Sequence, residues 1–207
     1  MLDFRTAALE DLLDAFASSE PLPGGGSAAA LTGALGVSLL LMVAGMAKTR
    51  TGTPEETVDL AAVAARLRPI RDELTTLVEE DSRAYLDVIT AYRAPRSTDE
   101  ERARRREVIE SAMRTAIDVP LRTMRACERA LRDAPVVARF GNPNAATDAA
   151  VGARLLVAAI ESAGLNVDVN LPGVRDAEFV DRSSQERQVL LASGTQLARQ
   201  VADAMRQ

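Results

Sequence analysis

Asp81 is the residue best suited to proton transfer, because it is an acidic side chain on the apolar face of a predicted helix. Leu77 lies four residues before it and Ala84 three residues after it, so all three share one helical face. Burial raises the pKa of a carboxyl group, which suits a general acid or base. An internal ion pair or a helix edge would also accommodate this aspartate, and the spacing alone favours such a structural role.

Histidine is absent from the sequence, which limits the side chains that could transfer protons, activate a nucleophile or bind a metal. Imidazole bases, Ser–His and Cys–His nucleophile pairs and histidine-ligated metal sites are excluded. Proton transfer must therefore use a carboxylate, lysine, tyrosine or water, which makes Asp81 the natural candidate.

The segment Gly24, Gly25, Gly26 and Ser27 places three glycines before a serine that is predicted to cap the next helix. Glycines allow a bound molecule close to backbone N–H groups, and a helix N-terminus carries a partial positive charge. The segment therefore suits a carboxylate or another anion. A tight connection between two helices would use the same residues, and helix caps are commoner than ligand sites.

Other polar residues surround a second apolar segment, at residues 149–163. Asn142, Asn144 and Asp148 belong to a cluster of turn-forming residues that ends in a predicted helix cap. We expect this cluster to lie beside the glycine segment or to face it, although an ordinary turn has the same composition. Asn166 continues the apolar helix, where its amide would line a polar pocket or pair across helices.

Arg50 follows an uncharged segment at residues 27–47. We expect its cation to stabilise the negative end of that helix or to meet an anionic ligand. The segment is long enough to span a bilayer, but its glycines and its lack of aromatic anchors favour a central helix that protein buries on all sides, without membrane contact.

Helical patterns account for the chain, and aromatic residues make up only 3% of it, which favours closely packed helices over a sheet. Residues 27–47 and 149–163 are expected to form two apolar central helices, and amphipathic helices are expected at 7–18 and 176–206. The predicted fold class is all-α, with a single domain over residues 1–207.

Local signals predict the remaining helix boundaries. Thr53 predicts a helix start at residue 54, and Ser97 or Thr98 opens a capping box. Pro69 is expected to kink the first of these helices. Pro120 is expected to end or kink the second, which gives two helices or one bent one.

Charge and cysteine content indicate where the protein acts. The net charge of −5 argues against nucleic-acid binding, which requires a basic face. The single Cys127 cannot form an internal disulfide and is expected to fill the core, as in a cytoplasmic protein. The first residues lack a signal-peptide pattern, so we expect a cytoplasmic location.

Several segments, in this order, resemble the cyclodeaminase/cyclohydrolase family of folate enzymes, which includes the C-terminal domain of formiminotransferase-cyclodeaminases and free-standing methenyltetrahydrofolate cyclohydrolases. The resemblance covers nearly the whole chain and is most specific at the triple glycine. Thr49 departs from the usual glycine before Lys or Arg, and Thr147 from the usual serine before Asp. The segments that carry the resemblance are residues 21–30, 81–85, 119–121, 141–142, 147–148 and 166–171.

The resemblance implies a bundle of long, mostly antiparallel helices and a homodimer with pockets near the subunit interface. It also implies chemistry without a metal or a permanently bound cofactor. Asp81 matches the acid/base residue of the family, and the substrate would be a tetrahydrofolate derivative. The residues implied to bind it are Gly24, Gly25, Gly26 and Ser27 through their backbone, Arg50 at the glutamate carboxylates, and Asn142, Asn144, Asp148 and Asn166 in the polar pocket.

Two reactions fit this resemblance. A cyclohydrolase adds water to 5,10-methenyltetrahydrofolate and opens it to 10-formyltetrahydrofolate, whereas a cyclodeaminase closes 5-formiminotetrahydrofolate to the methenyl compound and releases ammonia. We expect the cyclohydrolase, because the chain contains no formiminotransferase domain. A non-catalytic helical protein that binds folate or a partner helix is the alternative from another class.

Overall fold

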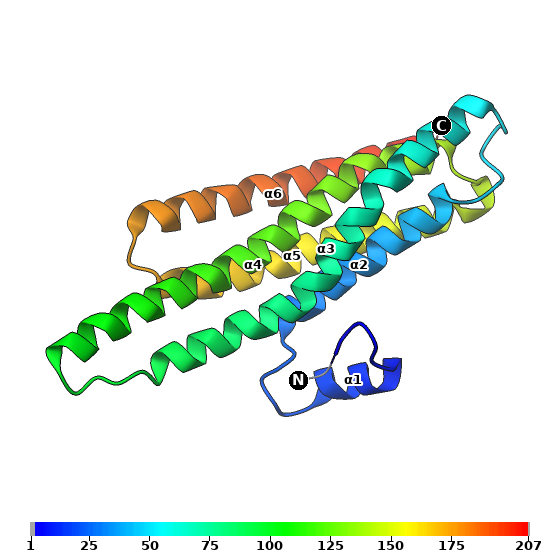
Figure 1. The fold of residues 1–207 in the computed structure, drawn as a ribbon. Helices are drawn as coiled ribbons and strands as arrows, with labels where there is room; N and C mark the ends of the chain where they lie inside the picture. The colour runs from blue at the N-terminus through cyan, green and yellow to red at the C-terminus, as the bar shows by residue number, and fades with distance from the viewer. Residues whose placement is uncertain (1–2, 207) are drawn as a thin grey trace.

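The computed structural model describes residues 3–206, and every regular element within them is a helix (Figure 1). The predicted all-α fold class is therefore confirmed. The elements in chain order are α1 (Leu9–Ala17), α2 (Gly25–Ala44), α3 (Pro54–Tyr92), α4 (Asp99–Phe140), the 3₁₀ turn η1 (Pro143–Ala145), α5 (Ala146–Asn170), the 3₁₀ turn η2 (Leu171–Gly173) and α6 (Ala177–Ala204).

The two apolar helices α2 and α5 run antiparallel with their backbones close together. A Cβ atom added at Gly36 would lie 2.8 Å from the Gly152 carbonyl oxygen, and one added at Gly152 would lie 2.9 Å from that of Gly36. Larger residues would force the two helices apart. Close packing here offsets the helix propensity that each glycine costs, about 1 kcal/mol relative to alanine.

The long helices α3 and α4 pack against this pair and continue through their prolines. Pro69 lies inside α3, and Pro120 and Pro135 lie inside α4. An interior proline removes one helical hydrogen bond, and apolar burial against neighbouring helices offsets that loss. Of the two outcomes predicted for Pro120, a single helix is therefore correct. The fully buried core includes Leu40, Leu67, Leu74, Ile117, Met124 and Leu156.

Capping side chains set the starts of α3 and α4 as predicted. The Thr53 hydroxyl accepts a hydrogen bond from the backbone N–H of Glu56 at 3.4 Å. Thr98 and Glu101 form a reciprocal capping box, with the Glu101 N–H donating to Thr98 Oγ1 at 3.1 Å. Both capping patterns could be predicted from the sequence because each involves residues only three positions apart.

The boundaries of α2 differ from the prediction at both ends. Gly24 is its N-cap, so Ser27 already lies within the first turn, and its hydroxyl bonds to α3 instead of capping α2. The helix stops at Ala44 with Gly45 as its C-cap. Arg50 therefore lies in the following loop and does not occupy the last turn of α2.

The remaining two helices, α1 and α6, flank these four helices, and α6 adds Leu190, Val201 and Ala204 to the buried core. α6 confirms the amphipathic helix predicted at residues 176–206 and packs against α4 and α5, and one link is the Ser193 hydroxyl, which donates to Glu128 Oε1 at 2.6 Å. α1 confirms the predicted helix at residues 7–18, but none of its residues is buried. It lies beside the bundle, near the start of α2 (Figure 1).

The predicted burial of residues 27–47 on all sides is wrong for a single chain, because the other described helices leave one side of α2 and α5 uncovered. The stretches Gly25–Ala44 and Pro143–Gly173 are long and apolar enough to cross a membrane by length and composition, yet 56% and 50% of their tested windows are buried within the chain. The exposed remainder is named here the α2–α5 face. Its large apolar residues are Leu35, Met42, Val151, Leu165 and Val169.

Candidate active site

Asp81 lies on α3, directly against the first turn of α2. A Cβ atom at Gly26 would lie 2.6 Å from Asp81 Cγ and 2.8 Å from its Oδ2, closer than atoms can pack. The carboxyl group therefore rests on the bare Cα of Gly26, in a space that only glycine leaves open.

Ser27 connects the two helices at this point. Its Oγ lies 3.0 Å from Asp81 Oδ2, 2.9 Å from the Val78 carbonyl oxygen and 3.2 Å from Ser82 Oγ. Ser27 and Ser82 are buried, whereas Asp81 is partly exposed. The carboxyl group is therefore hydrogen-bonded on its buried side and keeps access to solvent.

The surroundings of Asp81 favour its neutral form more than water does. Burial raises the pKa of Asp81, while hydrogen bonds from the Ser27 hydroxyl and backbone N–H oppose part of that rise. Within residues 3–206 no cation contributes to this shift, and Arg122, on neighbouring α4, is paired with Glu80. The internal ion pair that the sequence spacing allowed is not formed, so Asp81 is available to exchange a proton.

Asn166 joins this end of the bundle from α5. Its amide nitrogen lies 3.8 Å from the position that a Cβ atom of Gly25 would occupy, and it donates to the Ser162 carbonyl oxygen at 3.0 Å. The glycine segment, Asp81 and Asn166, which the resemblance implied to share one pocket, are therefore brought together.

A cavity of about 380 Å³ opens beside Ser82, between α3 and the chain that leads into α2. A space of this size can hold part of a drug-sized ligand. Neither Ser82 nor this cavity was predicted, because contacts between an N-terminal segment and α3 produce no local sequence pattern. The lining residues are Phe4, Ala15, Ser18, Glu20, Leu22, Pro23, Ser82 and Leu86.

Four predicted site residues lie at the opposite end of the chain's bundle. The Arg50 backbone N–H donates to the Phe140 carbonyl oxygen at 2.9 Å, which fixes Arg50 beside the end of α4. Asn142 Oδ1 accepts from the backbone N–H of Asn144 at 3.0 Å, a bond that shapes the turn, and Asp148 lies in the first turn of α5. The 20 residues of α2 separate these groups from Asp81 by about 30 Å.

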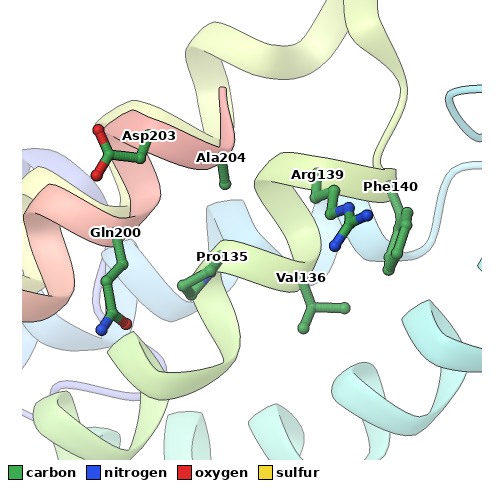
Figure 2. Close-up of a pocket in the computed structure, with 7 residues that line it drawn as sticks. All are labelled: Pro135, Val136, Arg139, Phe140, Gln200, Asp203 and Ala204. Carbon is green, nitrogen blue, oxygen red and sulfur yellow. The ribbon is translucent and has the colours of Figure 1, made fainter. Parts of the chain in front are cut away.

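The expectation that the polar start of α5 lies beside the glycine segment is therefore wrong for a single chain. α5 runs antiparallel to α2, so its end, not its start, adjoins Gly25. A separate pocket of about 320 Å³ lies near the far end, between α4 and α6 (Figure 2). There the guanidinium carbon of Arg139 lies 5.1 Å from the centre of the Phe140 ring. None of the predicted site residues lines the pocket.

Comparisons with known proteins show which family the sequence matches. The sequence pattern described as formiminotransferase-cyclodeaminase matches residues 8–189. A methenyltetrahydrofolate cyclohydrolase from Methylorubrum extorquens is 37% identical over 198 residues, which cover 96% of this chain and 95% of that protein. A formimidoyltransferase-cyclodeaminase from Gallus gallus is 34% identical over 79% of this chain, which corresponds to 30% of its own length.

The fold is also found among solved structures. Formiminotetrahydrofolate cyclodeaminase from Thermotoga maritima superposes with a TM-score of 0.86 and 24% identity, covering 99% of this chain and 98% of that one. The six-helix arrangement described above is therefore a known fold.

Proposed function

Because the chain belongs to the formiminotransferase-cyclodeaminase family, we propose that it acts on the one-carbon unit of a tetrahydrofolate, as a methenyltetrahydrofolate cyclohydrolase. The observation that carries this proposal is the match to the Methylorubrum extorquens cyclohydrolase over nearly the whole of both chains. The cyclodeaminase reaction is the second candidate, because the Gallus gallus relative shares 34% identity with this chain.

Asp81 supplies the proton transfers that ring opening requires. Its carboxylate takes a proton from a water molecule as the water oxygen attacks the methenyl carbon, which becomes tetrahedral. The carboxylic acid then gives this proton to nitrogen 5 as the bond from that nitrogen to the carbon breaks. The second proton of the water leaves to solvent, and the formyl group remains on nitrogen 10.

The start of α2 offers groups that would hold the substrate beside Asp81. The first N–H groups of a helix have no partner within it, and here Gly25 and Gly26 carry such groups, whereas the Ser27 N–H donates to Asp81. The Asn166 amide adds polar contacts at the same end, and the cavity beside Ser82 adds apolar ones. This end of the bundle therefore combines orientation of a ligand with a group that can exchange protons.

We also propose that the protein is a homodimer, in which a second copy covers the α2–α5 face. Leu165 and Val169 on α5 are 69% and 72% exposed, and Leu35 on α2 is 54% exposed. If two copies pack with their α2 helices antiparallel, the end that carries Arg50 in one copy adjoins the end that carries Asp81 in the other. Arg50, Asn142, Asn144 and Asp148 would reach the substrate in such a dimer.

The function is tested with purified protein and two substrates. Cyclohydrolase activity predicts rapid loss of the 5,10-methenyltetrahydrofolate absorbance, with 10-formyltetrahydrofolate as the product. Release of ammonia from 5-formiminotetrahydrofolate, without hydrolysis of the methenyl compound, would establish the cyclodeaminase instead. Binding of either folate without reaction would overturn both assignments in favour of a non-catalytic binding protein.

A further inference from the structure

The hydroxyl of Ser27 has one hydrogen atom but several oxygen neighbours. Asp81 Oδ2 lies 3.0 Å away, the Val78 carbonyl oxygen 2.9 Å away and Ser82 Oγ 3.2 Å away. Because Ser27 and Ser82 are buried, their hydrogen bonds must be made largely within the protein. The positions of the hydrogen atoms in this group therefore depend on whether Asp81 carries a proton.

Each charge state of Asp81 has an arrangement that satisfies both serines. When Asp81 is ionised, Ser27 donates to Oδ2 and Ser82 donates to Ser27 Oγ. When Oδ2 carries the proton, Asp81 donates to Ser27 Oγ, and Ser27 turns its own hydrogen toward the Val78 carbonyl oxygen. Ser82 continues to donate to Ser27 Oγ, since a hydroxyl oxygen accepts two hydrogen bonds.

We propose that Ser27 is a positioning residue for Asp81, whose hydroxyl rotates between the carboxyl group and the Val78 carbonyl oxygen as Asp81 gains and loses its proton. Asp81 then stays hydrogen-bonded in both states, and neither proton transfer leaves a buried polar group without a partner. The role in turnover rests on the proposed function, whereas the coupling between Ser27 and Asp81 does not.

The charged groups around this site leave Ser27 as the main polar influence on Asp81. α2 has no ionisable side chain from Gly25 to Ala44. On the neighbouring helices, Arg122 is paired with Glu80, and α5 presents the neutral Asn166. Glu20, from the segment before α2, lines the cavity beside Ser82. Burial and the hydrogen bonds from Ser27 account for the shifted pKa of Asp81.

The test is the titration of the Asp81 carboxyl carbon by NMR, without substrate, in the wild type and in Ser27→Ala. The signal is assigned by its loss in Asp81→Asn. The Ser27 hydrogen bond favours the carboxylate, so we expect Ser27→Ala to move the titration of Asp81 to higher pH. In the enzyme assay, the acid limb of kcat/KM should move in the same direction, with kcat falling about tenfold.

Two further variants make the result specific. Ser38→Ala is the matched control on α2, because the Ser38 hydroxyl donates to the Ala34 carbonyl oxygen of its own helix at 2.8 Å, so the titration should not change. Ser82→Ala leaves the bond from Ser27 to Asp81 in place and should give a smaller shift than Ser27→Ala. Circular dichroism confirms that each variant is folded.

An unchanged Asp81 titration in folded Ser27→Ala would overturn the proposal. So would a raised KM with an unchanged titration, because that pattern identifies a substrate contact. A shifted titration in a protein that hydrolyses no methenyl compound would support the coupling and disprove the proposed function, which keeps the two failures separate.

Discussion

Gly26 and Asp81 are 55 positions apart in the sequence, yet together they place one carboxyl group. The helical spacing around Asp81 predicted an inward side chain, and the structure places it against α2. The carboxyl group can occupy this position only because Gly26 has no side chain, since a Cβ atom there would fall 2.6 Å from Asp81 Cγ. The position of this carboxyl group thus depends on a glycine at a helix start as much as on its own helix.

Gly26→Ala should move the Asp81 carboxyl group while the helical fold is retained. The added methyl group must displace Asp81, and we expect kcat for the methenyl compound to fall about 100-fold, since small misplacements of reacting groups are costly. Gly164→Ala is the control, because its methyl group would meet Met124 Cε at an ordinary 3.6 Å. Stopped-flow absorbance measures both variants. Full activity in Gly26→Ala would mean that this cradle is dispensable.

The sequence predicted which residues lie together at this site better than it predicted their contacts. Asp81 and the glycines were found because spacing and composition are local signals. The sequence predicts that Ser27 caps α2, whereas its hydroxyl bonds to Val78 and Asp81 on another helix. Such a contact depends on which turn of α3 faces α2, and no periodicity within either helix encodes it.

At the scale of elements, the loop between α2 and α3 is held by one buried carboxylate. Glu56 Oε2 accepts hydrogen bonds from the Thr49 hydroxyl at 2.6 Å, from the Thr51 N–H at 2.9 Å and from the Gly52 N–H at 3.2 Å. Gly52 has a φ of +80°, a conformation that favours glycine. The loop that carries Arg50 is therefore ordered by the first turn of α3.

The Glu56 carboxylate should make stability depend on pH in acid. The Thr49 hydroxyl, aided by the N–H groups of Thr51 and Gly52, lowers the pKa of Glu56 from 4.5 to about 2. Because this pKa is lower in the folded state, its contribution is complete above about pH 4.5 and is lost as the pH falls toward 2. Urea unfolding should show this loss in the wild type and a weaker one in Glu56→Gln, which should also be less stable at pH 7. If the free energy of unfolding fell equally with pH in the wild type and in Glu56→Gln, the role assigned to Glu56 would be contradicted.

The sequence-based prediction placed the wrong end of α5 beside the glycine segment, although the lengths of the connections between helices determine the direction of α5. Short connections join α2 to α3, α3 to α4 and α4 to α5, and each reverses the chain. Three reversals make α5 antiparallel to α2, which puts Asn166 beside the glycine segment and Asp148 at the far end. The apolar composition indicated that these helices pack together but not which ends meet.

At the scale of the whole molecule, the α2–α5 face and the divided set of polar residues point to the same arrangement. A single chain brings the glycine segment, Asp81 and Asn166 together and leaves Arg50 about 30 Å away. The apolar face runs along α2 between these two ends. A second copy on this face would cover the exposed leucines and valines and supply the missing cation.

Leu35→Glu should therefore yield a monomer. A charge on α2 at the centre of the apolar face would be buried without a partner in the dimer, while in the monomer it is exposed. Val189→Glu is the control, because Val189 is 61% exposed on α6, away from this face. Sedimentation in detergent-free buffer should give a dimer for the wild type and the control. A monomeric wild type, or a dimeric Leu35→Glu variant, would contradict the proposed interface.

The most direct test of the central claim, that Asp81 moves the protons, is the turnover of 5,10-methenyltetrahydrofolate by Asp81→Asn, measured with its urea unfolding at pH 7. Burial raises the pKa of Asp81, so its ionisation costs stability as the pH rises above 3.8, and the neutral amide avoids that cost. We expect kcat to fall about 100- to 10,000-fold with stability equal to or above that of the wild type. Wild-type turnover by Asp81→Asn would contradict the claim.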